Sequence, residues 1–358
     1  MLFKPKTIST ILGVTLLSLP VILVNPHRQL FAQSTVSQDN YNPVFRGNSP
    51  PQNPDPLPPQ RLQLETQVQS DDFRITALQA DSSGDLWVGS WLGLSRINPE
   101  FDQIVSRLSL PNYTISSLAQ DKMNRIWVGT YKGLLRVEPK LNDLTAYTFH
   151  LPSHKILSLL IDNRGYLWVG GDRGLALISP DQGLIMTTLQ KLPGVSANAL
   201  SLDSEGQLWV GTLQGLVQVD TASAMIIDRI THIPGGVVQT MAVSNRGHLW
   251  VGTPDGLLVI NPQTKDILRS VTPLRGHNVT SLHFDEDNNI WVGTKKGLLK
   301  IEADSGAILA EVPNLPSNRI LSLAPNIGNK LWIGTSEGLA WLGENNGLVQ
   351  HHSLVTSH

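Results

Sequence analysis

The chain contains no cysteine, and this absence excludes several kinds of chemistry. Without thiols it cannot form a disulfide, use a thiolate nucleophile, hold an iron–sulfur cluster through cysteine or carry a lipid on an N-terminal cysteine. Charge is also sparse: charged residues make up 16% of the 358 residues, and the formal net charge is -2. Lys and Arg form no run or stripe along the sequence, so the electrostatic footprint of a nucleic-acid-binding protein is missing.

Known catalytic motifs are missing as well. The sequence has no Gly-x-Ser-x-Gly elbow, no His-Glu-x-x-His helix and no phosphate-binding loop, and its 10 histidines occupy different repeat positions. The acidic run at residues 285–289 begins like a calcium loop, but it lacks the glycine and the bidentate glutamate that such a loop needs. We therefore expect no catalytic residues, no cofactor-binding residues and no metal site.

One phrase is present seven times. Leu-Trp-Val-Gly-Ser or a close variant is followed two residues later by Gly-Leu, and successive tryptophans are 40 residues apart once and 41 residues apart five times. A fixed period of this length, built from strand-like segments, is typical of a β-propeller. We expect the repeated tryptophans to fill the gaps between blades, not to hold a cofactor. They are Trp87, Trp127, Trp168, Trp209, Trp250, Trp291 and Trp332.

Each repeat predicts four strands. In the first repeat, an alternating apolar segment at Ile75–Ala80 precedes a tight turn that begins at Asp81 and ends at Gly84. The Leu-Trp-Val-Gly strand follows, and its glycine allows a neighbouring chain to approach closely. A third strand ends near a proline, and a more polar fourth strand suits the outer edge of the blade. The fold class is therefore all-β, a seven-bladed propeller with four antiparallel strands per blade. One blade alone cannot bury its sheet, so we expect the blades to be stable only in the closed ring.

Two segments compete for the outer strand of blade seven. Residues 348–354 follow the last repeat, and residues 62–68 precede the first one, and both read as outer strands. We favour the N-terminal segment, because termini latched into one blade resist opening of the ring. The stretch His351–His352 would then lie outside the blade.

The repeat resembles that of the two-component-regulator propeller family. The resemblance rests on the pattern Ile-x-x-Leu-x-x-Asp-x-x-Gly-x-Leu-Trp-Val-Gly-Thr-x-x-Gly-Leu and covers roughly residues 75–341. In that family, propellers often form the exported sensory half of hybrid histidine kinases, frequently as two propellers followed by a small β-sandwich. The resemblance implies a sensing or binding role. Here we expect a single propeller without a kinase or receiver domain.

The N-terminus has the pattern of an export signal. Lys4 and Lys6 precede an apolar stretch at Ile8–Val24, and Leu30-Phe31-Ala32 is an imperfect cleavage site. Residues 1–32 are a signal peptide or an uncleaved membrane anchor, and cleavage is favoured. Residues 33–60 form a proline-rich linker, and residues 61–358 form the propeller. Either alternative places the propeller outside the cytoplasm, periplasmic or secreted, because the lysines stay inside.

The order of connections predicts a recognition face. The second-to-third and fourth-to-first connections of every blade emerge on the same side of the ring, around the mouth of its channel. The two-residue second-to-third loops vary within a nearly constant phrase, and variable loops on a rigid scaffold are the usual place for recognition. The candidates from these loops are Trp91, Tyr131, Lys132, Asp172, Arg173, Gln214, Asp255, Lys295, Lys296 and Glu337. The fourth-to-first connections add Asp71, Asp72, Arg74, Tyr113, His154, Lys155, His277 and Arg319.

The leading hypothesis is an exported, non-catalytic module that binds a ligand or a partner through this face. Trp91 and Tyr131 come from adjacent blades, and neighbouring exposed aromatics suit stacking on a sugar ring or a protein hot spot. The partner is an unidentified protein, a small molecule or a glycan, with a membrane signalling protein as one alternative; nucleic acid is excluded, and the chain is expected to be a monomer. The alternative function is an extracytoplasmic lyase or hydrolase with its site at the channel mouth.

Overall fold

The computed structural model describes residues 60–61, 72–147, 151–343 and 347–352. The chain divides into two compact units, Met1–Asn53 and Pro54–His358, and the first lies wholly outside the described residues. The expected signal or anchor at residues 1–32 and nearly all of the expected linker at residues 33–60 lie outside them too. Among the described residues, no helix is long and apolar enough to span a membrane.

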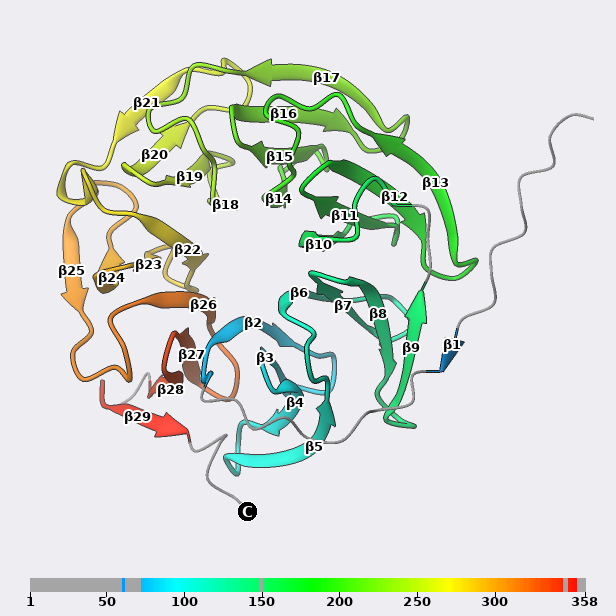
Figure 1. Ribbon diagram of the computed structural model, residues 1–358. Coiled ribbons are helices and arrows are strands. Elements are labelled where there is room, and N and C mark those ends of the chain that lie inside the picture. Colours follow the sequence, from blue (N-terminus) through cyan, green and yellow to red (C-terminus); the bar gives the residue numbers. More distant parts are fainter. Residues whose placement is uncertain (1–59, 62–71, 148–150, 344–346, 353–358) are drawn as a thin grey trace, which may run out of the picture. The chain divides into compact units, whose positions relative to one another are not determined.

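The second unit contains seven antiparallel sheets arranged around a ring, which confirms the predicted fold class (Figure 1). Each sheet takes four consecutive strands from one repeat, and we number these blades one to seven along the chain. The inner strands are β2 (Ile75–Ala80), β6 (Ile115–Gln120), β10 (Ile156–Ile161), β14 (Ala199–Leu202), β18 (Thr240–Val243), β22 (Val279–Phe284) and β26 (Ile320–Ala324). The second strands, which carry the repeated tryptophan, are β3 (Leu86–Ser90), β7 (Ile126–Thr130), β11 (Leu167–Gly171), β15 (Leu208–Thr212), β19 (Leu249–Thr253), β23 (Ile290–Thr294) and β27 (Lys330–Thr335).

The two remaining strands of each blade lie farther from the ring centre (Figure 1). The third strands are β4 (Gly93–Asn98), β8 (Gly133–Glu138), β12 (Gly174–Ser179), β16 (Gly215–Asp220), β20 (Gly256–Ile260), β24 (Gly297–Ile301) and β28 (Gly338–Gly343). The outer strands are β5 (Gln103–Ser109), β9 (Asp143–Tyr147), β13 (Leu184–Leu189), β17 (Met225–Ile230), β21 (Ile267–Ser270), β25 (Ile308–Glu311) and β29 (Val349–His352). One 3₁₀ turn, η1 (Thr272–Leu274), follows β21. The short strand β1 (Gln60–Arg61) pairs with β9 and adds a fifth strand to blade two.

The repeated Trp and Gly form the contact between neighbouring blades, as predicted. Trp87 is 1% exposed and packs against Ile115 and Leu118 of blade two. A Cβ atom added to Gly89 would lie 2.6 Å from the Ile115 side chain, so only glycine lets the next inner strand come this close. The tryptophan side chain and the glycine thus lie on the same face of the blade. The indole fills the space between blades, and the glycine leaves room for the neighbouring inner strand.

Hydroxyl side chains on the inner strands, and one amide just before an inner strand, form hydrogen bonds from one blade to the next. Thr76 donates a hydrogen bond to the carbonyl of Ile115 at 2.5 Å, and Ser116 donates to the carbonyl of Ile156 at 2.8 Å. The remaining links of this kind are Ser158 to Ala197, Asn198 to Val238, Thr280 to Ile320 and Ser322 to Ile75. The last of these joins blade seven to blade one, so the ring closes through side-chain contacts between its first and last inner strands.

The outer strand of blade seven comes from the C-terminal end, so the preference for residues 62–68 is wrong. Strand β29 pairs with β28, with Val349 opposite Leu342 and His352 opposite Leu339. A hairpin with a short connection costs less loop-closure entropy than a strand brought from the other terminus. Val349 packs in the core of blade seven, and the His352 ring lies 6.0 Å from the Trp332 ring. Residues 62–68 lie outside the described residues.

His352 makes the closing contact sensitive to pH. Its side chain is 5% exposed, and its Nε2 lies 3.6 Å from the Asp102 carboxylate of blade one. Desolvation lowers the pKa of His352 below the usual 6.5, and the positive charges of Lys330 and Arg107 also lower it, against the opposing effect of Asp102. The folded protein therefore favours the neutral imidazole.

We expect the stability of the protein to fall as the pH drops below about 6.5, because the unfolded chain then binds a proton that the folded chain resists. His352→Gln, which stays neutral, should flatten this dependence in thermal unfolding measured from pH 5 to pH 8. His154→Gln, at an exposed position, serves as the control. Equal pH profiles for wild type and His352→Gln would contradict the assignment; a slope that remains in the variant is expected from His283, whose pKa is also lowered by desolvation.

Candidate functional site

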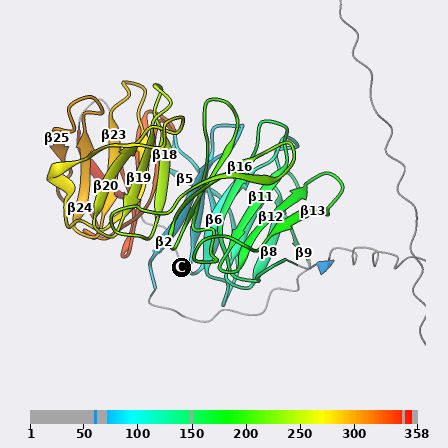
Figure 2. The ribbon, with the colours of Figure 1, turned by 90° about the horizontal axis from the view of Figure 1, so that it is seen from above.

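The strands run between two loop-bearing faces of the propeller (Figure 2). The second-to-third loops and the fourth-to-first connections share one face, as predicted. Backbone hydrogen bonds between the two sets of loops show that they are adjacent. The backbone N–H of Tyr131 donates to the carbonyl of Thr114 at 3.0 Å, and that of Ser336 donates to the carbonyl of Arg319 at 3.0 Å. We call this side the top face, and the side that carries the first-to-second and third-to-fourth turns the bottom face.

The threonine that ends the repeated phrase makes the top-face loops rigid. The Thr130 hydroxyl donates to the carbonyl of Gly133 at 2.8 Å and accepts from the backbone N–H of Lys132 at 3.1 Å. Thr212, Thr253, Thr294 and Thr335 make the same pair of bonds in their own blades. The two variable residues of each such loop are therefore displayed on a fixed backbone, which is the property that a recognition surface needs.

Aromatic and cationic side chains gather on the top face over blades one to three. Arg74 forms an ion pair with Asp72, and its guanidinium carbon lies 5.6 Å from the centre of the Trp91 ring. The hydrogen bonds from Arg74 hold the pKa of Asp72 below its usual value, against the effect of desolvation. This pair therefore stays ionised and holds the guanidinium beside the indole.

Blades two and three continue the same arrangement. Lys155 of blade three places its Nζ 4.5 Å from the centre of the Tyr131 ring, and Lys132 places its Nζ 5.3 Å from the Tyr113 ring. Tyr131 is 45% exposed, so its ring is open to a ligand as well as to the lysine. We call Arg74, Trp91, Tyr131, Lys132 and Lys155 the cation–aromatic row. An alternation of flat rings and cations suits a ligand that carries both ring-sized apolar surfaces and acidic groups.

The other predicted residues lie on the same face, spread around the ring. Asp172 is half-buried and accepts a hydrogen bond from Ser153, and His277 is half-buried. The exposed ones are His154, Arg173, Gln214, Asp255, Lys295, Lys296, Arg319 and Glu337. Asp71 lies outside the described residues. The structure therefore pairs Arg74 with Trp91, Lys132 with Tyr113 and Lys155 with Tyr131 on blades one to three, and it leaves the candidates of blades four to seven as a wider rim.

Basic residues that are scattered along the sequence collect on the top face. The described top-face loops carry Arg74, Lys132, Lys155, Arg173, Lys191, Arg275, Lys295, Lys296 and Arg319, against Asp72, Asp172, Asp255 and Glu337. The described bottom-face turns carry Asp81, Asp85, Glu100, Asp102, Asp121, Asp162, Asp181, Asp203, Glu205, Asp266, Asp285, Glu286, Asp287, Glu302 and Asp304, against Lys122, Arg125, Lys140, Arg164, Arg246 and Lys265. The two faces thus carry an excess of opposite charge, and a positive potential of this kind favours the approach of acidic molecules to a surface.

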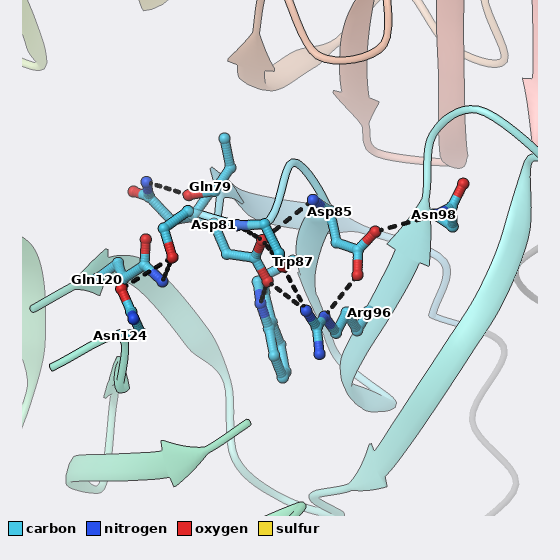
Figure 3. A network of polar contacts seen from close by, with 11 residues as sticks. Gln79, Asp81, Asp85, Trp87, Arg96, Asn98, Gln120 and Asn124 are labelled. Atoms are coloured by element: carbon cyan, nitrogen blue, oxygen red, sulfur yellow. Dashed lines mark hydrogen bonds and ion pairs between the residues drawn. The ribbon is translucent and has the colours of Figure 1, made fainter. Parts of the chain in front are cut away.

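The bottom-face turns contain a buried polar pair that the sequence did not reveal. In blade one, the indole Nε1 of Trp87 donates to Asp81 Oδ2 at 2.9 Å, while Asp81 Oδ1 accepts from the backbone N–H groups of Ser83 and Asp85 (Figure 3). Arg96 forms ion pairs with the carboxylates of Asp81 and Asp85, and its guanidinium carbon lies 5.6 Å from the centre of the Trp87 ring. Burial by itself raises the pKa of Asp81, but the hydrogen bonds from Ser83 and Trp87 and the charge of Arg96 outweigh it and lower this pKa.

The signal for this pair was present in the repeat. Asp recurs six residues before Trp in most units, and we assigned it only to the turn because a turn aspartate bonds its own backbone. A buried indole N–H also needs a partner. Spacing alone did not connect the two, because the aspartate and the indole meet only when strands one and two form a hairpin.

The inner strands carry one histidine among the described residues, His283 on β22. It lies opposite Trp291 in the blade and is accessible to water, yet the surrounding protein desolvates it and lowers its pKa. In the described part of the chain, no group of three or more His, Asp or Glu residues is close enough to hold a metal ion.

The sequence matches one family profile, described as the two component regulator propeller, at residues 109–132, 150–173, 191–214 and 273–296. Each match runs from the approach to an inner strand to the second-to-third loop, which includes the repeated phrase. The comparison with curated proteins found no match to this sequence.

Solved structures with similar folds include proteins of two kinds. An extracellular domain assigned to a hybrid two component system from B. thetaiotaomicron is 20% identical, with a TM-score of 0.65 over 80% of this chain and 42% of that domain. A second such domain from the same organism is 19% identical, with a TM-score of 0.57 over 77% of this chain and 48% of that one. The virginiamycin B lyase from Staphylococcus aureus is 17% identical, with a TM-score of 0.65 over 78% of this chain and 97% of the lyase. This chain thus spans less than half of either sensor domain, and the similarities establish the fold.

Proposed function

Because the chain carries two component regulator propeller repeats in a seven-bladed propeller, we propose that it is an extracytoplasmic, non-catalytic binding module that works as a sensor or scaffold through its top face. The fold is shared with extracellular domains of hybrid two component systems, which supports a sensory role. The export pattern at residues 1–32 supports the location. A separate membrane protein would pass the signal on.

The observation that carries this proposal is the cation–aromatic row. Short loops hold Trp91 and Tyr131 on adjacent blades, each with a cation against its ring, and the two Thr130 bonds fix the loop of Tyr131. Aromatic side chains on a fixed backbone lose little conformational entropy on binding, and they dominate the energetics of many interfaces. The positive top face selects acidic ligands or partners.

We expect Trp91→Ala combined with Tyr131→Ala to weaken binding of the partner by about tenfold or more, because each aromatic supplies buried apolar area at the centre of the row. The measurement begins with capture from the envelope fraction of the source cell, followed by titration calorimetry of the identified ligand or partner. Because Tyr131 is exposed and Trp91 is half-buried in a surface loop, the melting temperature should change little.

The matched control removes two exposed apolar residues from the bottom face. Phe101 is 65% exposed and Met123 is 62% exposed, so Phe101→Ala with Met123→Ala removes comparable side chains without touching the row. If the control weakens binding as much as the top-face variant, the recognition surface is not the top face. If neither variant changes any detected interaction, the binding role of this face is wrong.

The alternative of a lyase or hydrolase has one supporting observation, the desolvated His283, which lies near the bottom-face end of the inner strand β22 and not at the top-face mouth of the channel. A lowered pKa keeps this imidazole neutral near pH 7, which is the state that a general base needs. Turnover of an extracellular glycan or a small molecule that is lost in His283→Ala and retained in the top-face double variant would favour the enzyme over the binding module.

A further inference from the structure

Blade five departs from the polar pattern that the bottom-face turns of blades one to four share. In blades one to four, the indole N–H of the repeated tryptophan donates to the turn aspartate, at distances of 2.9, 2.8, 3.1 and 3.0 Å. In blade five this turn position is Ser244, whose hydroxyl oxygen stands one bond closer to the backbone than an aspartate oxygen does. In blade seven, where this aspartate is also missing, the Trp332 indole donates to the carbonyl of Ile327 at 3.1 Å.

The serine leaves donors without acceptors. Ser244 Oγ accepts the backbone N–H of His248 at 3.1 Å, the bond that corresponds to one made by the aspartates. In the described part of the chain, nothing accepts a hydrogen bond from the Trp250 indole or from the backbone N–H of Arg246. In blade four, the matching groups donate to the two oxygens of Asp203, from the Trp209 indole at 3.0 Å and from the Glu205 backbone at 3.0 Å.

The missing carboxylate coincides with a cavity. Between blades five and six a cavity of about 200 Å³ opens on the bottom face, far larger than the ~30 Å³ that a water molecule occupies in the liquid. Ser244, Arg246 and Trp250 line its polar side, and Val259, Leu268 and Ala303 line its apolar side. The two unsatisfied donors lie on residues of the polar side.

Two arginines give the cavity a positive potential. Arg269 lies over the Trp250 ring, with its guanidinium carbon 5.3 Å from the ring centre, and donates to the carbonyl of Asp304 at 2.6 Å. Arg246 pairs with the Asp304 carboxylate at 2.7 Å on the cavity rim. Because a single carboxylate stands against these two guanidinium groups, an additional negative charge is favoured.

We propose that this cavity is a binding site for a small carboxylate with an apolar body. Its oxygens take the place of the aspartate oxygens of blades one to four, accepting from the Trp250 indole and the Arg246 backbone. Its apolar body lies against Val259, Leu268 and Ala303. The site is on the bottom face and is independent of the cation–aromatic row.

The test follows the indole N–H resonance of Trp250 in protein labelled with ¹⁵N-tryptophan, assigned by its loss in Trp250→Phe. Butyrate is the probe, butyramide is its neutral analogue of the same shape, and sodium chloride at equal concentration controls for ionic strength. We expect a saturable shift of this resonance with butyrate and none with butyramide or chloride. A shift common to all three, or no saturable shift with butyrate, overturns the proposal.

Ser244→Asp supplies the missing carboxylate from the chain itself. We expect it to weaken butyrate binding by about tenfold or more, to move the Trp250 resonance toward the positions of the Trp168 and Trp209 resonances, and to raise the melting temperature. The converse variant, Asp203→Ser, should make the Trp209 resonance respond to butyrate. Unchanged butyrate binding in Ser244→Asp would show that the anion does not occupy the aspartate position and would overturn the proposal even if Asp203→Ser does not fold.

Discussion

Trp209→Ala is expected to lower the free energy of unfolding by about 3–5 kcal/mol, because a fully buried indole leaves a cavity that the surrounding strands cannot fill. Trp209 is 0% exposed and packs against Val238, Met241 and Leu249 of blade five. The substitution also leaves Asp203 Oδ2 without the indole donor that binds it at 3.0 Å. In thermal unfolding we expect a loss of about 10 °C in melting temperature.

Two further variants separate the parts of this effect. Trp209→Phe keeps most of the apolar volume but removes the indole N–H, and should cost about 1–2 kcal/mol. Trp91→Ala removes the same side chain from a top-face loop and should change stability by less than about 0.5 kcal/mol. A Trp209→Ala protein that melts at the wild-type temperature would refute the placement of this ring between blades.

Gly334→Ala is expected to cost about 3 kcal/mol, because it overpacks the contact that closes the ring. The added Cβ would lie 2.6 Å from the backbone oxygen of Ile75 in blade one and 2.2 Å from the Ser322 hydroxyl. A backbone oxygen cannot rotate away, so blade seven must move back from blade one. The bond from Ser322 to Ile75, at 3.1 Å, would be lost with that movement.

Gly293→Ala is the matched control for the closing contact. It stands at the same repeat position in blade six, where the added Cβ would meet side-chain atoms of Ser281 and Ile320 and no backbone oxygen among its nearest neighbours. We expect a loss of about 1 kcal/mol there, measured for both variants by denaturant unfolding. Equal losses in the two variants would show that the contact between blades seven and one is no tighter than an ordinary one.

Much of the fold was predictable because its signals are local. The alternation at Ile75–Ala80 is found as strand β2 with the same bounds, and the turn that ends at Gly84 has the positive φ of 88° that favours glycine there. Asn124 replaces that glycine in blade two with a φ of 64°, a conformation that asparagine tolerates. The apolar pattern, the turn residue and the strand length agree within each repeat. The strands of a repeat could therefore be predicted without reference to the neighbouring repeats.

The closure of the ring was not predictable in this way. Both candidate outer strands have suitable patterns, and pattern alone does not say which one pairs with β28. The C-terminal hairpin places Val349 in the apolar core of blade seven and His352 against Trp332. Only packing against the finished blade distinguishes that hairpin from its competitor.

The sequence predicted the face on which the candidate site lies, but not which of its side chains contact one another. Connection order alone placed Trp91 and Tyr131 on one side of the ring. That Lys155 reaches across from blade three to the Tyr131 ring depends on the offset between neighbouring blades, which no single repeat contains.

The sequence by itself determined the number of blades, the order of strands and the face on which each loop emerges, because these follow from period and alternation along the chain. The tertiary structure decided which terminus completes blade seven, the separation of charge between the two faces and which of the buried indoles find an acceptor. Ser244 shows the difference: in the sequence it is an ordinary turn residue, and it marks a cavity only because the indole that would bind an aspartate there comes from the next strand. Contacts between residues that are distant in the chain cannot be inferred from local sequence patterns, because they form only when the blades pack against one another in the closed ring.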